Sequence, residues 1–175
     1  MLNLGRSNEL RLAKNGFFSP TKGSMTLGKI MNEITDFVKN DPEGVYRVVI
    51  GSDSQVKHNN GIKECDFVTA IVIHRRGCGG RYFWKKEKVM KIPVLRERIY
   101  IEASRSLTTA LELAPFLKEC MMEKKWDCEI HIDVGPNGKT KEMVNEVVGM
   151  VSGSGFTAKT KPDSWGASSV ADKHT

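Results

Sequence analysis

The segment VYRVVI at residues 45–50, followed at once by GSDSQ at residues 51–55, is the part of the sequence that decides the fold. A run of β-branched residues of this kind is typical of a strand in the middle of a sheet. The change to small and polar residues at Gly51 predicts that the strand ends there and that Asp53 stands at its end. Because a carboxylate beside a buried sheet is costly to desolvate unless cations or hydrogen-bond donors accompany it, Asp53 is the first candidate functional residue.

Helical and strand patterns extend in both directions from this segment. The spacing of apolar residues predicts helices over 25–40, 93–125, 141–150 and 164–171, and strands over 67–73, 81–90, 129–134 and 156–161. Three strands joined by short connections, followed by alternating helices and strands, predict an α/β fold. We expect a mixed five-stranded sheet flanked by helices, in which the first three strands are antiparallel and the later strands are parallel additions.

Length and composition indicate one globular domain. The chain has 175 residues, of which 39% are hydrophobic, and single domains usually have about 100 to 200 residues. We expect residues 25–175 to form this domain and residues 1–24 to form a loosely ordered N-terminal arm. The sequence lacks an apolar stretch long enough for a membrane span, a secretory signal and any C-x-x-C pair, so it predicts a cytoplasmic protein without membrane contact.

The net charge of +6 leaves two interpretations open. It fits a polyanionic partner such as nucleic acid, and it fits equally well a surface of solvated lysines. The same ambiguity holds for residues 81–91, where four lysines accompany three aromatic residues. The lysines could follow a phosphate backbone while the aromatic residues stack on bases. Alternatively, the segment is an edge strand whose lysines prevent pairing with other chains and whose aromatic residues are buried, which we slightly favour.

Three further carboxylates stand at positions comparable with that of Asp53. Asp133 ends the predicted strand 129–134, and the ends of strands are where ligand crevices form in open α/β sheets. Glu102 flanks the apolar stripe of the long helix, about 90° from it, and Asp172 lies among small residues near the C-terminus. Each residue alone also fits a turn, a cap or a solvated surface. If the strands that carry Asp53 and Asp133 are neighbours, however, these two carboxylates lie within reach of one hard divalent cation, which prefers oxygen ligands.

The order of these acidic residues resembles that of the ribonuclease H-like (RNase H-like) superfamily. Five segments are similar to its YkuK-type family of predicted nucleases, and the similarity covers nearly everything from Met25 onward. The segments are IGSDSQV (50–56), ERIYIEA (97–103), IHIDVGPN (130–137), VVGMVSGSGF (147–156) and KPDSWGASSVADK (161–173). The long helix after the third strand departs from the pattern of well-studied RNase H enzymes.

This resemblance implies a metal-dependent nuclease that hydrolyses phosphodiester bonds of RNA, DNA or a hybrid. Asp53, Glu102, Asp133 and Asp172 would be the catalytic and metal-binding residues, with two Mg²⁺ or Mn²⁺ ions and Asp53 as the bridging ligand. The alternative is an RNase H-like module that binds nucleic acid or takes part in an assembly with little or no turnover.

Other polar residues are candidates for supporting roles. His131 and His174 each lie two residues from a proposed ligand and are candidates for proton transfer. Trp165 could stack on a base, although we expect it to pack in the core. The segment GPNGKT at 135–140 resembles a P-loop, but two residues instead of four separate its glycines, which argues against an ATPase. The candidate contacts to nucleic acid are Ser54, Gln55, Asn137, Lys139, Lys161 and Trp165.

Overall fold

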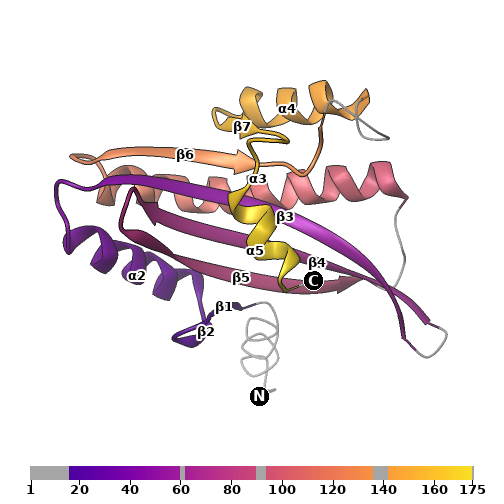
Figure 1. Cartoon of the computed structure of the whole chain (residues 1–175), viewed down its shortest axis with the longest axis horizontal. Coiled ribbons are helices and arrows are strands. Elements are labelled where there is room, and N and C mark those ends of the chain that lie inside the picture. Colours follow the sequence, from indigo (N-terminus) through magenta and orange to yellow (C-terminus); the bar gives the residue numbers. More distant parts are fainter. Residues whose placement is uncertain (1–15, 60–61, 90–93, 136–141, 175) are drawn as a thin grey trace, which may run out of the picture.

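The computed structural model describes residues 16–59, 62–89, 94–135 and 142–174, apart from the side chains at 59, 62, 63, 167 and 168. Within these ranges the chain forms one mixed sheet with helices on both faces (Figure 1). The elements are β1 (Phe17–Ser19), β2 (Gly23–Met25), α2 (Leu27–Lys39), β3 (Val45–Asn59), β4 (Ile62–Arg75), β5 (Gly79–Val89), α3 (Leu95–Cys120), β6 (Lys125–His131), α4 (Val144–Gly153), β7 (Thr157–Lys159) and α5 (Gly166–Asp172).

The sheet has the strand order β2-β1-β5-β4-β3-β6-β7. Strands β3, β4 and β5 are antiparallel neighbours, whereas β6 runs parallel to β3 and β7 runs parallel to β6. This confirms the predicted α/β fold with an antiparallel first half and parallel additions. The predicted number of five strands is wrong, because the sheet has seven.

The two additional strands come from the segment that was expected to be a loosely ordered arm. Strand β1 pairs with β2 in a hairpin and with β5 through Phe18 and Trp84. Phe17 and Met25 point into the core and are each 5% exposed. Burial of these two apolar side chains stabilises the hairpin on the sheet, a contribution that the short and irregular sequence pattern did not reveal.

Strand β3 is much longer than its apolar run. It continues through Asp53 to Asn59 because β4 pairs with it over this whole length and satisfies its backbone. The expectation that the strand ends at Gly51 is therefore wrong, and Asp53 lies within the strand. What ends at this level is the neighbouring strand: in the described part of the chain, β6 pairs with β3 up to the pair of Gly51 and His131.

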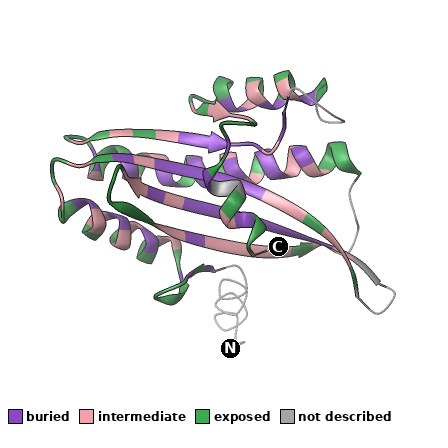
Figure 2. Ribbon diagram, viewed as in Figure 1, coloured by how far each residue is buried: buried purple, intermediate pink, exposed green. Residues whose placement is uncertain are grey.

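The two faces of the sheet are covered unequally. Helices α2, α3 and α4 bury a large apolar core against one face, which includes Ile34, Ile50, Leu113 and Val147. The short helix α5 crosses the other face and buries a small cluster around Val49 and Ala171. Figure 2 shows the buried residues along the central strands and on the inward sides of these helices. The face that carries α5 is therefore open over much of its area.

The helices differ from their predicted bounds mainly at their ends. Thr26 caps α2, because its Oγ1 accepts a hydrogen bond from the backbone N–H of Lys29. Pro115 lies inside α3, which nevertheless continues to Cys120, so the proline does not interrupt the helix as it commonly does. None of the described helices is long and apolar enough to cross a membrane.

The buried carboxylate of Asp66 on β4 yields a test of the sheet. Its Oδ2 lies 3.1 Å from Lys57 Nζ and 3.4 Å from Lys86 Nζ. Burial alone would raise the pKa of Asp66, but hydrogen bonds and charges from the two lysines outweigh it and hold the pKa below 3.8. Asp66→Asn should therefore lower the free energy of unfolding at pH 7 by about 1 to 3 kcal/mol, measured by urea denaturation.

The sign of the pH dependence follows from the lowered pKa. The stabilisation is present above the ordinary pKa of 3.8 and is lost as the pH falls through the lower pKa of the folded state. The difference in free energy of unfolding between wild-type protein and Asp66→Asn should consequently shrink as the pH falls below 3.8. Asp36→Asn, on the exposed side of α2, is the control and should change stability little. A difference at Asp66 that stays constant down to pH 2 would contradict the explanation.

Candidate functional site

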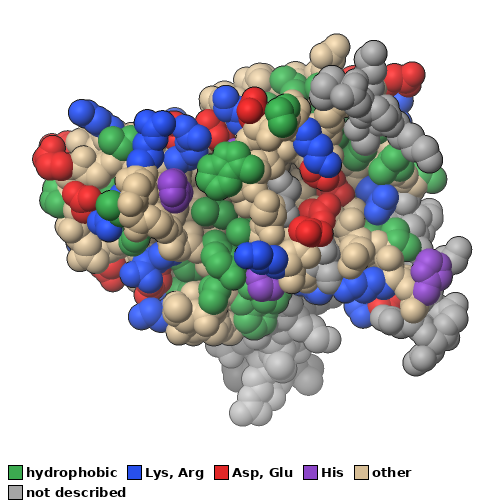
Figure 3. All heavy atoms as spheres, viewed as in Figure 1, with side chains coloured by type: hydrophobic (Ala, Val, Ile, Leu, Met, Phe, Trp, Pro, Cys, Tyr) green, Lys and Arg blue, Asp and Glu red, His purple; other side chains and the backbone are tan. Residues whose placement is uncertain are grey.

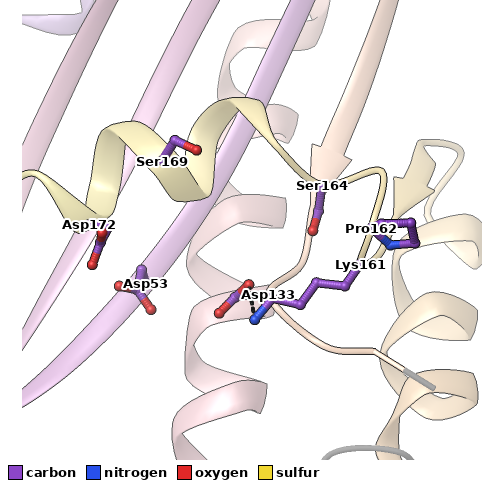
Figure 4. A pocket seen from close by; sticks show the side chains of 7 residues that line it. All are labelled: Asp53, Asp133, Lys161, Pro162, Ser164, Ser169 and Asp172. Carbon is purple, nitrogen blue, oxygen red and sulfur yellow. Dashed lines mark ion pairs between the residues drawn. The ribbon is translucent and has the colours of Figure 1, made fainter. Parts of the chain in front are cut away.

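Three carboxylates from three different elements line one open pocket. Asp53 comes from the middle of β3, Asp133 follows the end of β6 by two residues, and Asp172 is the last residue of α5. The pocket has a volume of about 400 Å³ and is also lined by Lys161, Pro162, Ser164 and Ser169. Figure 4 shows Asp53 and Asp172 side by side, with Asp133 next to them. In Figure 3 acidic side chains gather near the centre of the open face.

The end of β6 creates the room for this pocket. Because β6 stops opposite Gly51, the edge of β3 at Asp53 faces the loop after β6 and not a neighbouring strand. This loop stays beside the end of β7 and the residues that follow it. The Ile132 N–H donates a hydrogen bond to the Lys159 carbonyl (2.9 Å), and the Lys161 N–H donates one to the Val134 carbonyl (2.8 Å). Asp133 is thereby held at the open edge of β3.

Helix α5 is fixed over the pocket by its first residue. The backbone N–H of Gly166 donates a hydrogen bond to His131 Nδ1 at 3.1 Å. A Cβ at this position would lie 3.4 Å from Val49 Cγ1 and 3.5 Å from His131 Cε1, which is ordinary van der Waals contact, so the start of the helix packs directly on β3 and β6. This contact sets where Asp172 stands at the other end of the helix.

The carboxylates of the pocket influence one another. Burial raises the pKa of Asp53, and the negative charges of Asp133 and Asp172 raise it further. The backbone N–H of Ser54 and the guanidinium of Arg98 act in the opposite direction without cancelling the increase. A carboxyl group in this setting is stabilised by any added cation, because a positive charge favours its ionised form.

Glu102 approaches from the other side of the sheet. Side chains alternate along a strand, so Ser52 and Ser54 point toward α3 while Asp53 points toward α5. Glu102 on α3 is buried, and its Oε1 accepts a hydrogen bond of 2.5 Å from Ser54 Oγ. Burial raises the pKa of Glu102 to about 7, with contributions from Asp53 and Asp133. Glu102 is therefore electrostatically coupled to the pocket but does not line it.

The residue types fit a hard divalent cation, whereas their present arrangement is not a preformed metal site. The pocket offers carboxylate oxygens, the ligands that Mg²⁺ and Mn²⁺ prefer. Among the described residues, no three acidic, His or Cys side chains are grouped closely enough to hold an ion. The Nζ atom of Lys161 lies 2.9 Å from Asp133 Oδ1, and the Glu102 carboxylate is held by Ser54. Binding an ion would require these side chains to move inward.

The two candidate histidines have different surroundings. His131 is 2% exposed, accepts the hydrogen bond from Gly166 at Nδ1, and places Nε2 3.1 Å from Glu129 Oε2. Nε2 therefore carries the proton, and proton transfer by His131 would require breaking these bonds. His174 stacks on Trp84 with the ring centroids 4.0 Å apart and lies outside the set of residues that line the pocket. Proton transfer by either residue stays a prediction.

The candidate contacts to nucleic acid are distributed around the pocket. Lys161 lines it, Ser54 points to the opposite face, and Gln55 is exposed on the face of Asp53. Trp165 is 52% exposed, so the expectation that it packs in the core is wrong. Asn137 and Lys139, and with them the segment that resembles a P-loop, lie outside the described residues.

The basic and aromatic segment of β5 is largely paired within the protein. Lys86 lies 3.4 Å from Asp66, and Lys88 forms an ion pair with Glu64. Phe83 is buried, as expected if the aromatic residues of the segment pack inside the protein. The segment is not an edge strand, however, because β1 pairs with it on its outer side. The lysines within β5 are therefore already compensated by acidic neighbours, whereas Lys91 lies outside the described residues.

Several residues around the site were not identified from the sequence. Ser164 and Ser169 line the pocket, and Arg98 lies 3.5 Å from Ser54 through its Nη1. Both serines belong to the segment KPDSWGASSVADK, whose similarity to the YkuK-type family was the signal that could have identified them. Arg98 precedes Glu102 by one helical turn, a spacing at which opposite charges commonly interact.

The raised pKa of Glu102 yields a prediction about stability without metal. A carboxyl group whose folded pKa lies above its unfolded value destabilises the protein as the pH rises from 4.5 to about 7. In EDTA, Glu102→Gln should therefore raise the free energy of unfolding at pH 8 by about 1 to 3 kcal/mol. At pH 4 the two proteins should unfold alike in urea. Glu112→Gln, on the exposed side of the same helix, is the control; a loss of stability in Glu102→Gln at pH 8 would contradict the prediction.

Comparisons with known proteins agree with the family that the sequence motifs suggested and with the fold. Residues 29–175 match the family described as Ribonuclease H-like. The chain is 33% identical over 172 residues to a Bacillus subtilis (strain 168) protein named "Uncharacterized protein YkuK", covering 91% of this chain and 96% of the relative. No solved structure matches the chain significantly. The protein belongs to the ribonuclease H-like family, as its motifs and its mixed sheet predicted.

Proposed function

We propose that this protein is a metal-dependent nuclease that hydrolyses phosphodiester bonds of RNA or DNA. The observation that carries the proposal is the convergence of Asp53, Asp133 and Asp172, from three separate elements, on one open pocket. Carboxylates that repel one another are costly to place together, so a cation is the simplest reason for such an arrangement. Membership of the ribonuclease H-like family supports the same chemistry.

The residues of the pocket suggest how the reaction would be divided among them. Asp53, Asp133 and Asp172 would hold a Mg²⁺ or Mn²⁺ ion, with Glu102 as a further ligand once it leaves Ser54. A bound ion would activate water and stabilise the developing negative charge. Hydrolysis joins the water oxygen to phosphorus and breaks one phosphorus–oxygen bond, and the leaving oxygen takes up a proton. The Lys161 ammonium, within the pocket, would contact the anionic phosphate.

The open face of the sheet supports a nucleic-acid substrate. Trp165 is 52% exposed on this face, and its ring lies 6.2 Å from that of His74 on β4. Phe18 is 42% exposed and stacks on Trp84 with the centroids 5.1 Å apart. Exposed aromatic rings offer stacking surfaces to bases whatever their sequence. A strand lying on this face would reach the carboxylates across the short helix α5.

A second candidate function is nucleic-acid binding without turnover. The arrangement of the pocket favours it to some extent, because Lys161 already pairs with Asp133 and Glu102 is held by Ser54. A protein that uses this face for binding alone has no need to bring these carboxylates together around an ion. Cleavage assays that compare wild-type protein with a substitution of a proposed metal-binding residue separate the two functions.

The test of catalysis compares wild-type protein with Asp53→Asn on labelled RNA/DNA hybrid, duplex RNA, single-stranded DNA and branched DNA, with Mg²⁺, Mn²⁺ or EDTA. We expect metal-dependent cleavage of at least one substrate and a reduction of at least about 10²-fold in Asp53→Asn, because each ligand contributes several kcal/mol to the transition state. Asp127→Asn, at the other end of β6, is the control and should retain activity. Binding without cleavage of any substrate would favour the second candidate function.

Trp165→Ala tests the proposed binding face. Stacking of one base on an aromatic side chain contributes about 1 to 3 kcal/mol, so the Kd for single-stranded nucleic acid should rise about 5-fold to 100-fold. Fluorescence anisotropy with a labelled oligonucleotide measures this change. Met122→Ala, a 78% exposed apolar residue after α3, serves as the matched control. Equal affinities of Trp165→Ala and wild-type protein would argue against stacking on this residue.

A further inference from the structure

A second pocket lies on the face of the sheet opposite to the carboxylates, between β5 and α3. Side chains alternate along a strand, so Lys85 and Glu87 share the side of the buried Phe83, which belongs to the large core. Helix α3 contributes Ser104, Arg105 and other residues of one side of the helix. The pocket has a volume of about 370 Å³, and pockets for small molecules usually have about 300 to 1,000 Å³.

Two cations in this pocket share one carboxylate. Lys85 Nζ lies 3.7 Å from Glu87 Oε1, and the Arg105 guanidinium contacts Glu87 Oε2 from α3. Glu87 thus compensates only one of the two positive charges, and the three side chains carry a net charge of +1. The side chains of Lys85 and Arg105 are only 21% and 22% exposed, so solvent and salt screen their charges less than at the open surface.

Aromatic rings hold both cations in place without neutralising them. The Arg105 guanidinium lies over the buried ring of Phe67, 4.5 Å from its centroid. Lys85 Nζ lies over the ring of Phe17 at 5.2 Å. A ring attracts a cation through its quadrupole but carries no net charge. The excess positive charge is therefore fixed at the pocket in the protein as it stands.

The remaining groups supply hydroxyls and an apolar wall. Ser104 and Thr108 line the pocket with exposed side chains, whose hydroxyls can donate hydrogen bonds to an anion. The Tyr100 hydroxyl donates to Glu146, which also pairs with Arg96 at 3.0 Å. That neighbouring ion pair adds no net charge, and the ring of Tyr100 forms an apolar part of the lining.

We propose that this pocket binds the phosphate group of a small phosphorylated molecule. A guanidinium has five N–H groups and an ammonium has three, more than one carboxylate occupies, so Arg105 and Lys85 can contact phosphate oxygens while they pair with Glu87. Ser104 would donate to the same phosphate, and the organic part of the ligand would lie against Tyr100. The carboxylates of the other pocket take no part, so the inference does not depend on the proposed nuclease function.

Nuclear magnetic resonance of ¹⁵N-labelled protein locates and measures the binding. Adenosine monophosphate is titrated to millimolar concentrations in EDTA, so that a metal ion at the carboxylate pocket cannot recruit its phosphate. Inorganic phosphate, adenosine and an oligonucleotide without terminal phosphates are the comparisons. We expect saturable shifts of the Ser104 and Thr108 amide signals with adenosine monophosphate and inorganic phosphate, and none with adenosine.

Several results would overturn the proposal. These are the absence of saturable shifts at Ser104 and Thr108, shifts confined to the carboxylate pocket, and equal binding of adenosine and adenosine monophosphate. Binding of the oligonucleotide alone would also overturn it, because the phosphate would then belong to a nucleic-acid backbone. Cleavage by the Asp53-dependent site is measured separately, so either proposal can fail without the other.

Charge variants test the two cations and their shared carboxylate with opposite signs. Arg105→Gln should raise the Kd for adenosine monophosphate at least about 10-fold, because a charge-assisted hydrogen bond is lost. Glu87→Gln removes the competing carboxylate and should lower the Kd about 3-fold or more. Lys118→Gln, on the exposed side of the same helix, is the control and should leave the Kd unchanged.

The opposite signs keep the test decisive. Thermal unfolding verifies that the variants are folded, and a gain of affinity in Glu87→Gln cannot come from unfolding. If Arg105→Gln and Glu87→Gln both bind adenosine monophosphate as wild-type protein does, the pocket is not a phosphate site.

Discussion

The parallel pairing of β6 with the first half of β3 is the constraint on which the candidate site depends. The pairing stops at Gly51 and His131, whereas β3 continues for eight residues beside β4. The backbone of β3 is thus held rigidly on one side and exposed to a loop on the other. If β6 were two residues longer, Asp133 would lie within the ladder and the edge of β3 at Asp53 would be covered.

The unequal covering of the sheet determines where a polymer could reach this edge. Three helices bury the large core on one face, so most of the buried apolar side chains lie on that face and only a small cluster lies under α5. The face that carries α5 can remain open and display Trp165 and the carboxylates at little cost in buried apolar area. Glu102 belongs to the buried face, and burial raises its pKa to about 7. The open pocket with Asp53, Asp133 and Asp172 therefore lies on one side of β3, and the buried Glu102 lies on the other side.

Sequence patterns predicted the mixed α/β topology and three of the carboxylates that line the pocket, and they failed where the decisive contact is distant in the chain. The β-branched run 45–50 identified the central strand, but the length of β3 follows from its pairing with β4, which its own residues do not reveal. The hairpin at residues 17–25 depends on burial of Phe17 and Met25 against the core. Asp53 and Asp133 were identified because each stands near the end of an apolar strand pattern, and Asp172 because it lies among small residues near the C-terminus. The bond between Ser54 and Glu102, by contrast, depends on the packing of α3.

The position of Lys161 shows why the order of acidic residues in a sequence does not by itself determine how they are grouped in the structure. Four carboxylates in the family order form one group only if all four face the same space. Here strand alternation places Ser54 and Glu102 behind Asp53, and the register after β7 places an ammonium group on Asp133. Both effects separate carboxylates that the sequence pattern grouped together. Strand alternation and backbone register therefore decide which charged side chains share the pocket.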